Sequence, residues 1–308
     1  MAQSSAFQSI LFPVDFSKMT EVTAPYVRGL AEYTGATVTL LHVIPSLAGW
    51  YGARELRSST IADERLHALH NRQKLALEMF GKKHFSHLRC SQCVKEGAVA
   101  ETIADTAQET RADLIMMPTR GLGVSRRFLI GSTTAKVLHD ATCAVWTSPH
   151  LDELKPFAGF HHLLCTIDRK EVLPEFLKEA LRLASCFGSR LSFFTAVPSM
   201  VGGFGEERTI RALKEEYPQA GLDDEPDCGR GCTVYFETGS VGEVVRRLAT
   251  EQQVDLVITN RGHLQHPSSK LRTHAYEIVL QSPCPVLSLA MTVRAPAEIR
   301  EHAVFETV

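Results

Sequence analysis

Glycines and hydroxyl residues gather in one stretch of the sequence, Met116–Leu138. The chain leaves an apolar run there, passes Gly121 and Gly123, and opens a helical pattern with Gly131–Thr133. Glycine lets a backbone pass close to a ligand, and the N–H groups and hydroxyls at a helix start can bind an anion. We therefore predict a phosphate-binding loop, in which the N–H groups of Gly131, Ser132 and Thr133 receive phosphate oxygens.

Short apolar runs alternate with helical patterns through the first half of the chain. The predicted strands are Ile10–Val14, Val38–Ile44, Cys93–Lys95, Leu114–Met117 and Ala144–Thr147. The predicted helices are Thr20–Tyr33, Asp63–Lys83, Ala100–Thr110 and Thr133–His139. Gly35 follows the first helix, where a left-handed C-cap residue is expected. Pro25 predicts that this helix starts later or kinks.

Strand–helix alternation of this kind predicts a parallel sheet with right-handed crossovers and helices on both faces. Such a sheet binds its ligand at the carboxyl ends of the strands, where the strand order reverses. The glycine stretch follows the fourth predicted strand, and the first strand ends in Pro13-Val14-Asp15. We expect these two strand ends to flank the binding crevice.

The sequence of the first half recurs in the second. SILFPVDFS at Ser9–Ser17 matches HLLCTIDRK at His162–Lys170, and VTLLHVIPS at Val38–Ser46 matches LSFFTAVPS at Leu191–Ser199. We predict an α/β protein with two homologous domains, residues 1–150 and 157–292, and a C-terminal tail, residues 293–308. Each domain is expected to be a Rossmann-like, doubly wound, parallel five-stranded sheet.

The spacing around the glycines resembles that of a known family. Gly121, nine further residues and then Gly131-Ser132 follow the nucleotide loop of the universal stress protein family, with Pro118 in place of that loop's first glycine. PVDFS at Pro13–Ser17 and LHVIP at Leu41–Pro45 also match. The chain is similar to a tandem universal stress protein over nearly all of its first half, and more weakly over its second.

This resemblance implies that the first half binds one adenine nucleotide, ATP or ADP, with or without Mg²⁺. It implies that Asp15 and the backbone at Val43 hold the base and sugar. No Walker-type, HExxH or GxSxG motif is present, which favours a stress-response or signalling switch with slow ATP hydrolysis at most over a fast enzyme. The predicted site residues are Pro13, Asp15, Val43, Met117, Pro118, Thr119, Arg120, Gly121, Gly123, Gly131, Ser132 and Thr133.

The second half departs from the pattern at the decisive place. Arg272-Thr273 stands where Gly131-Ser132 stands in the first half, although Asp168 keeps the position of Asp15. We expect a domain that keeps the fold and has lost the nucleotide. The resemblance implies that the last strand of each half pairs the two domains, with Trp146 near the seam, and that a homodimer can form in the same way.

Two other readings stay open. Gly121 and Gly123 could be turn glycines and Ser132 a helix N-cap, in which case the protein is a nucleotide-free interaction scaffold. The spacing of His84, His87, Cys90 and Cys93 could instead collect zinc or respond to thiol oxidation, although no metal site is our expectation.

Composition narrows the class of protein. The chain has 308 residues, 44% of them hydrophobic, and a formal charge of −2, which allows two full domains and gives no basic signature of nucleic-acid binding. No apolar run is long enough to span a membrane, and the N-terminus has no charged leader before its apolar run. The chain has eight cysteines, most of them inside strand- or helix-like segments, which suggests reduced thiols. The expected location is therefore the cytoplasm, and the sequence names no protein partner.

Overall fold

The computed structural model describes residues 6–46, 60–120, 130–148, 157–167, 174–196, 232–261 and 273–290. The first half forms β1 (Ser9–Pro13), α1 (Lys18–Thr34), β2 (Thr37–Pro45), α2 (Thr60–Phe85), β3 (Cys90–Gly97), α3 (Val99–Glu109), β4 (Leu114–Met117), α4 (Ser132–Asp140) and β5 (Ala144–Thr147). The second half forms β6 (His162–Ile167), α5 (Pro174–Phe187), β7 (Arg190–Ala196), β8 (Thr233–Glu237), α7 (Val241–Glu251), β9 (Leu256–Asn260), α8 (Thr273–Gln281) and β10 (Val286–Leu289). This order confirms the predicted α/β class.

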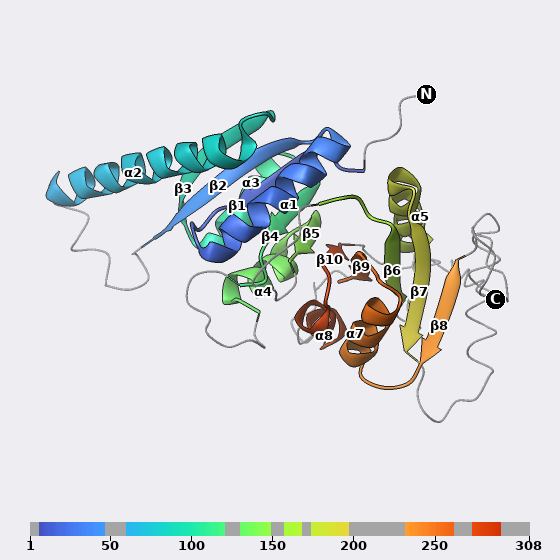
Figure 1. Cartoon of the computed structure of the whole chain (residues 1–308). Helices are drawn as coiled ribbons and strands as arrows, with labels where there is room; N and C mark the ends of the chain where they lie inside the picture. Colours follow the sequence, from blue (N-terminus) through green and yellow to red (C-terminus); the bar gives the residue numbers. More distant parts are fainter. Residues whose placement is uncertain are drawn as a thin grey trace, which may run out of the picture.

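The strands form one ten-stranded sheet in the order β3-β2-β1-β4-β5-β10-β9-β6-β7-β8 (Figure 1). Within each half the five strands are parallel and their order is the same, as the repeat predicts. The two sets meet edge to edge, because β5 and β10 pair antiparallel with Trp146 opposite Leu287. The doubly wound sheets therefore continue into each other instead of ending at separate edges.

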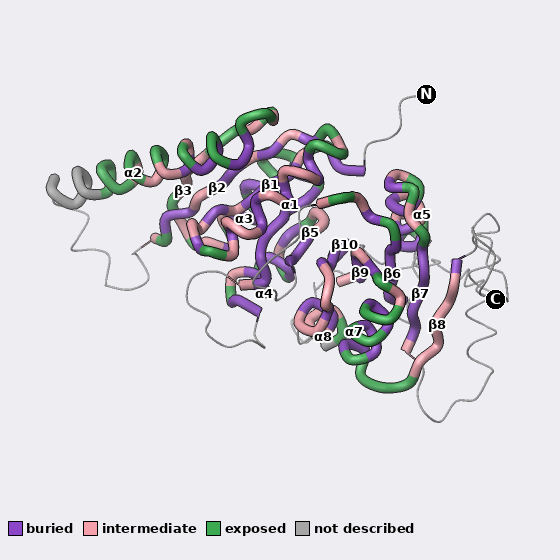
Figure 2. Tube along the Cα trace, in the orientation of Figure 1, coloured by how far each residue is buried: buried purple, intermediate pink, exposed green. Residues whose placement is uncertain are grey.

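Helices cover both faces of this sheet, as expected. On one face, α1, α2 and α5 pack over a core that includes Phe12, Trp146 and Phe193. On the other face, α3, α4, α7 and α8 pack over a second core that includes Ile115 and Val257. Each core contains residues of both halves, and the strands at its centre are buried (Figure 2). The hydrophobic interior is thus shared across the repeat.

The boundaries of α1 follow from its caps. Ser17 is the N-cap and its side chain accepts a hydrogen bond from the N–H of Thr20, while Gly35 adopts φ 71° at the C-cap. The expected C-cap is thereby confirmed. The predicted later start at Pro25 is wrong, because the capping contacts begin the helix at Lys18 and Pro25 lies inside it.

Two elements are longer than predicted. β3 was expected over Cys93–Lys95 but pairs with β2 from Cys90 to Gly97, and α2 runs from Thr60 to Phe85. The prediction relied on apolar runs and missed the polar residues at both ends of β3. An edge strand such as β3 needs few apolar side chains. No helix within the described ranges is long and apolar enough to cross a membrane.

Aromatic rings fill the region where the halves meet. Tyr26 of α1 stacks on Trp146 of β5, with ring centroids 4.8 Å apart. Phe157 contacts Tyr26 edge-on at 5.4 Å and Phe160 at 4.9 Å. The residues just before β6 therefore lie against the first helix of the chain, next to the joined edges of the sheet.

Candidate functional site

The strand order reverses between β1 and β4. These two strands pair, with Leu11 opposite Ile115, yet the chain continues from β1 through α1 to one side and from β4 to the other. Asp15 follows the end of β1 by two residues, and Pro118 directly follows β4. The two predicted flanks of the crevice therefore lie side by side at the carboxyl ends of β1 and β4.

The first turn of α4 is tied to the chain that leaves β4. The Gly131 N–H donates to the carbonyl oxygen of Thr119 at 2.9 Å, and the Thr134 hydroxyl donates to the carbonyl oxygen of Pro118 at 3.1 Å. Thr119 and Thr134 are both buried. The start of α4 is therefore fixed against β4, and its N-terminus points at the reversal of the strand order.

Gly131 rather than Ser132 is the N-cap residue, with φ −60° and ψ 143°. No side chain caps the helix. The Gly131 N–H donates to the carbonyl oxygen of Thr119, and its contact with a phosphate oxygen stays a prediction. Within the described residues, the N–H groups of Ser132 and Thr133 donate no hydrogen bond to the protein, and Ser132 is exposed. These two amides carry the positive end of the α4 dipole.

The protein leaves space at Gly131. A Cβ added there would lie 3.5 Å from the carbonyl oxygen of Thr119, an ordinary van der Waals contact. The φ of −60° is also accessible to every amino acid. Packing and backbone geometry therefore do not require glycine at this position.

Asp15 already has protein partners. Its Oδ1 accepts a hydrogen bond from the Ser17 N–H at 3.0 Å and a second from the Thr20 hydroxyl. Between them, Phe16 adopts a left-handed conformation with φ 58°, an uncommon state for an aromatic residue. The carboxylate therefore shapes the turn from β1 into α1, besides any contact with a ligand.

The end of β2 lies beside this turn. His42 Nδ1 is 2.7 Å from the carbonyl oxygen of Val14, and its ring packs against Phe16 with centroids 4.7 Å apart. Val43 is buried, and Pro13 is half-buried at the end of β1. Phe16 and His42 were not among the predicted site residues. Phe16 directly follows Asp15 in the sequence and His42 directly precedes Val43, and this adjacency could have identified both as site residues.

Part of the predicted site lies outside the described residues, namely Gly121 and Gly123. The same holds for Asp168 and Arg272 of the second half. Met117, Pro118 and Thr119 are buried at the end of β4, and Arg120 is half-buried. The described site therefore comprises the ends of β1, β2 and β4 together with the start of α4.

A cavity of about 350 Å³ lies elsewhere, at the opposite ends of β1, β4 and β5. Asp113 and the Glu179–Arg182 ion pair line it. None of the predicted site residues contributes to this cavity, which is therefore separate from the crevice at the strand reversal.

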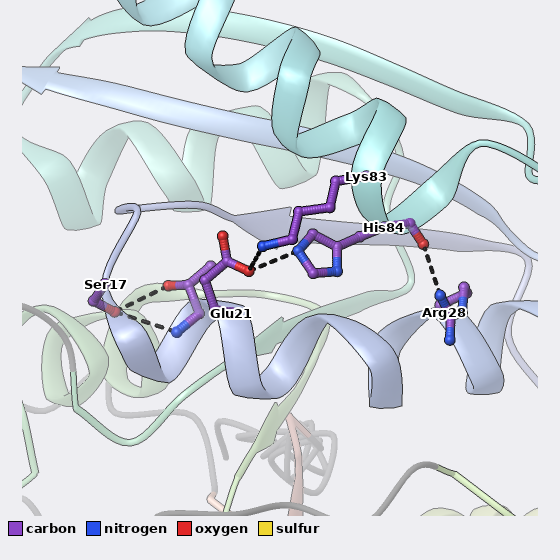
Figure 3. Close-up of polar contacts among 6 residues, drawn as sticks. Ser17, Glu21, Arg28, Lys83 and His84 are labelled. Atoms are coloured by element: carbon purple, nitrogen blue, oxygen red, sulfur yellow. Dashed lines mark hydrogen bonds and ion pairs between the residues drawn. The ribbon is translucent and has the colours of Figure 1, made fainter.

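His84, His87, Cys90 and Cys93, the alternative zinc ligands, do not form a metal site among the described residues. His84 is buried at the end of α2, and its Nε2 lies 2.8 Å from Glu21 Oε2, to which Lys83 donates at 2.6 Å (Figure 3). Arg28 reaches the carbonyl oxygen of His84 at 3.5 Å. Within the described ranges, no three metal-ligating side chains come together. These contacts join α1 to α2.

Cys90 and Cys93 lie on β3, three residues apart. Side chains at odd separations in a strand point to opposite faces, so the strand separates the two thiols. Burial raises the pKa of Cys90 to about 11 and also raises the pKa of Cys93. Both thiols therefore have little thiolate character at neutral pH, which weighs against a reactive redox pair.

Comparison with known proteins adds family information to this geometry. A model of the universal stress protein family matches the chain twice, over residues 6–149 and 159–289. The two matched segments correspond to the two halves of the repeat.

Individual relatives agree. A universal stress protein of Mycolicibacterium smegmatis is 28% identical over 145 residues, which are 46% of this chain and 48% of that protein. The alignment thus spans about half the length of this relative. A universal stress protein of Methanocaldococcus jannaschii is 29% identical over 147 residues, covering 45% of this chain and 80% of that protein. The crystal structure of a universal stress protein from Archaeoglobus fulgidus matches with a TM-score of 0.67 at 16% identity, over 93% of this chain and 97% of that one, and so shares the fold.

Proposed function

The chain belongs to the universal stress protein family, and on that premise we propose that its N-terminal half binds one adenine nucleotide, ATP or ADP. The protein then acts as a switch in stress response or signalling, in the cytoplasm. We propose domain bounds of 1–150 and 157–292, with a C-terminal tail over 293–308. Mg²⁺ accompanies the nucleotide if it is ATP.

One observation carries this proposal. α4 starts at Ser132, and Gly131 just before it bonds to Thr119, two residues after the end of β4 at the strand reversal. The amides of Ser132 and Thr133 belong to this first turn. Helix N-termini attract anions by about 0.3–1 kcal/mol when exposed, and by more when water is excluded. The phosphates are assigned to these amides and to the loop with Gly121 and Gly123.

The base and sugar are assigned to the other side of the crevice. Asp15 follows β1 there, and Val43 lies near the end of β2. Pro13, Met117, Pro118, Thr119 and Arg120 form the walls and entry of the proposed site, and Gly131 forms its floor. Phe16 and His42 extend the apolar side on which an adenine ring would rest.

The proposed role is binding with slow turnover at most. Asp15 follows the end of β1 by two residues, and its Oδ1 accepts hydrogen bonds from Ser17 and Thr20 at the start of α1. A general base must lie within hydrogen-bond reach of the attacking water. Occupancy of the site, more than hydrolysis, is therefore the proposed signal.

The second half is proposed to be a built-in partner that holds no nucleotide. It pairs with the first half through β10, and Arg272-Thr273 replaces the glycine and serine of the first half. A homodimer of the whole chain is a further proposal, and it would use surfaces other than the paired edges of β5 and β10.

The test is to purify the protein natively, denature it and identify the released small molecules by mass spectrometry. The proposal predicts ATP or ADP at up to one molecule per chain, and restored binding when the stripped protein is titrated with either nucleotide, with and without Mg²⁺. If no nucleotide is released and none rebinds, the nucleotide-free scaffold becomes the better description.

A further inference from the structure

A half-buried arginine reaches from the second half into the first. Arg261 directly follows β9, and its Nη1 donates to the carbonyl oxygen of Leu138 at 2.6 Å, while its Nη2 donates to the carbonyl oxygen of Cys143. Leu138 is in the last turn of α4, and Cys143 immediately precedes β5. One guanidinium thus bridges both sides of the turn that ends α4.

The backbone of Arg261 is fixed as well. Its N–H donates to the carbonyl oxygen of Leu289, at the end of β10, at 3.0 Å. The backbone from which the Arg261 side chain projects is therefore fixed, at the carboxyl ends of β9 and β10. A planar guanidinium with fixed donors suits two carbonyl acceptors better than a lysine ammonium does.

The charge of Arg261 is balanced by backbone dipoles. Within the described part of the chain, no carboxylate forms an ion pair with it. Burial lowers the pKa of Arg261 to about 10, so the side chain is still charged at neutral pH. The carbonyl groups at the C-terminus of a helix carry the negative end of its dipole and stabilise such a cation.

The helix that Arg261 holds is the one whose other end forms the proposed phosphate site. α4 has nine residues and is therefore about 13 Å long, with Ser132 at its start and Leu138 in its last turn. Its first turn is bonded to Thr119 and Pro118. A short helix held at both ends moves as one body.

Sequence equivalence adds to this argument. Arg261 occupies, in Asn260-Arg261-Gly262, the position that Arg120 occupies in Thr119-Arg120-Gly121. Arg261 therefore donates its side-chain hydrogen bonds to the first half, and these N–H groups are not available to a phosphate in the second half. We propose that Arg261 is a positioning residue, through which the second domain sets the placement of α4 and hence the nucleotide affinity of the first. This inference rests on the proposed function.

The test compares the full-length Arg261→Gln and Arg261→Lys variants with wild type. Arg246→Gln is the matched control, because Arg246 is exposed on α7. Two quantities are measured at 25 °C: ATP affinity by titration of the stripped protein, and amide hydrogen exchange along α4. We expect Arg261→Gln to bind ATP at least fivefold more weakly and to exchange faster in the last turn of α4. Arg261→Lys should lose less affinity, and Arg246→Gln should match wild type.

A folded Arg261→Gln protein with ATP affinity within twofold of wild type would overturn the inference, even if exchange in α4 were faster, since Arg261 would then be structural only. If Arg261→Gln does not fold, Arg261→Lys decides, because it keeps the charge: unchanged affinity overturns the inference and weakened affinity supports it. If wild type itself binds no ATP, the proposed function fails first, and the coupling falls with it.

Discussion

Glu21 joins α1 to the end of α2 through Lys83 and His84. Burial raises the pKa of Glu21, but the hydrogen bonds and the charges of Lys83 and His84 together outweigh burial, so its pKa is lowered from its ordinary value. A carboxylate with a lower pKa in the folded state stabilises the fold above its unfolded pKa, and this contribution is lost as the pH falls through the folded pKa.

We therefore predict that wild type loses more free energy of unfolding than Glu21→Gln between about pH 6 and about pH 3. Urea titrations at several pH values measure this difference. Glu243→Gln, at an exposed position on α7, is the control. Parallel pH profiles for wild type and Glu21→Gln would show that the three side chains do not interact in solution.

Residue positions at the site were more predictable than residue contacts. The spacing of Gly131 from Gly121 indicated a helix start, and the structure has α4 beginning directly after Gly131. The bond from the Gly131 N–H to Thr119 could not be predicted, because it depends on how the intervening chain returns to β4. The hydrogen bond from Arg261 to Leu138 could not be predicted either, because the two residues are 123 positions apart in the sequence.

Among the elements, α4 is tied to the chain after β4 by a buried side-chain hydrogen bond. The Thr134 hydroxyl donates to Pro118, and Thr134→Val would remove this bond while keeping the shape of the side chain. Burying an unsatisfied carbonyl costs about 1–3 kcal/mol. We predict a loss of stability in this range together with weaker nucleotide binding, both measured on the stripped protein.

Thr250→Val is the matched control for this substitution. Thr250 is exposed on α7, and its hydroxyl bonds only within its own helix. Its effect should stay within about 0.5 kcal/mol. Equal effects of the two substitutions would mean that the link between α4 and β4 contributes little.

The periodicity of apolar residues was sufficient to predict which elements exist. The predicted boundaries were less accurate where an element ends in polar residues. α3 and α4 agree with the predicted helices to within one residue at each end. α1 begins earlier than predicted because Asp15, Ser17 and Thr20 bond to one another, an effect of side-chain capping rather than of apolar period. β3 extends further because pairing with β2, and not burial, holds its ends.

For the whole molecule, the repeat predicted two copies of one fold, and the structure has five parallel strands in each half. The antiparallel register of β5 with β10 could not be predicted, because short apolar strands fit several registers equally well. The two shared cores follow from this pairing.

Shared cores predict that the two halves unfold together. Trp146 is buried at the seam against Tyr26, and Trp146→Ala should cost about 3–5 kcal/mol. Calorimetry should give one transition for wild type and one transition at lower temperature for the variant. Met79→Ala, at a position 64% exposed, should change little. Two separate transitions in wild type would contradict the shared interior.

Phosphate binding at the start of α4 is the proposal on which the function rests, and substitution of Gly131 tests this proposal. A Cβ at Gly131 meets the protein only at ordinary van der Waals distances. In the proposed site, a larger side chain there would crowd a phosphate bound at the amides of Ser132 and Thr133. Ser240→Val is the matched control, because Ser240 is also a helix N-cap without a side-chain capping bond, and it is exposed.

The decisive measurement is calorimetric titration of ATP into nucleotide-free wild type, Gly131→Val and Ser240→Val, each shown to be folded by circular dichroism. We expect wild type and Ser240→Val to bind one ATP per chain with similar affinity, and Gly131→Val to bind ATP at least tenfold more weakly. Undiminished ATP binding by a folded Gly131→Val protein would contradict the proposal.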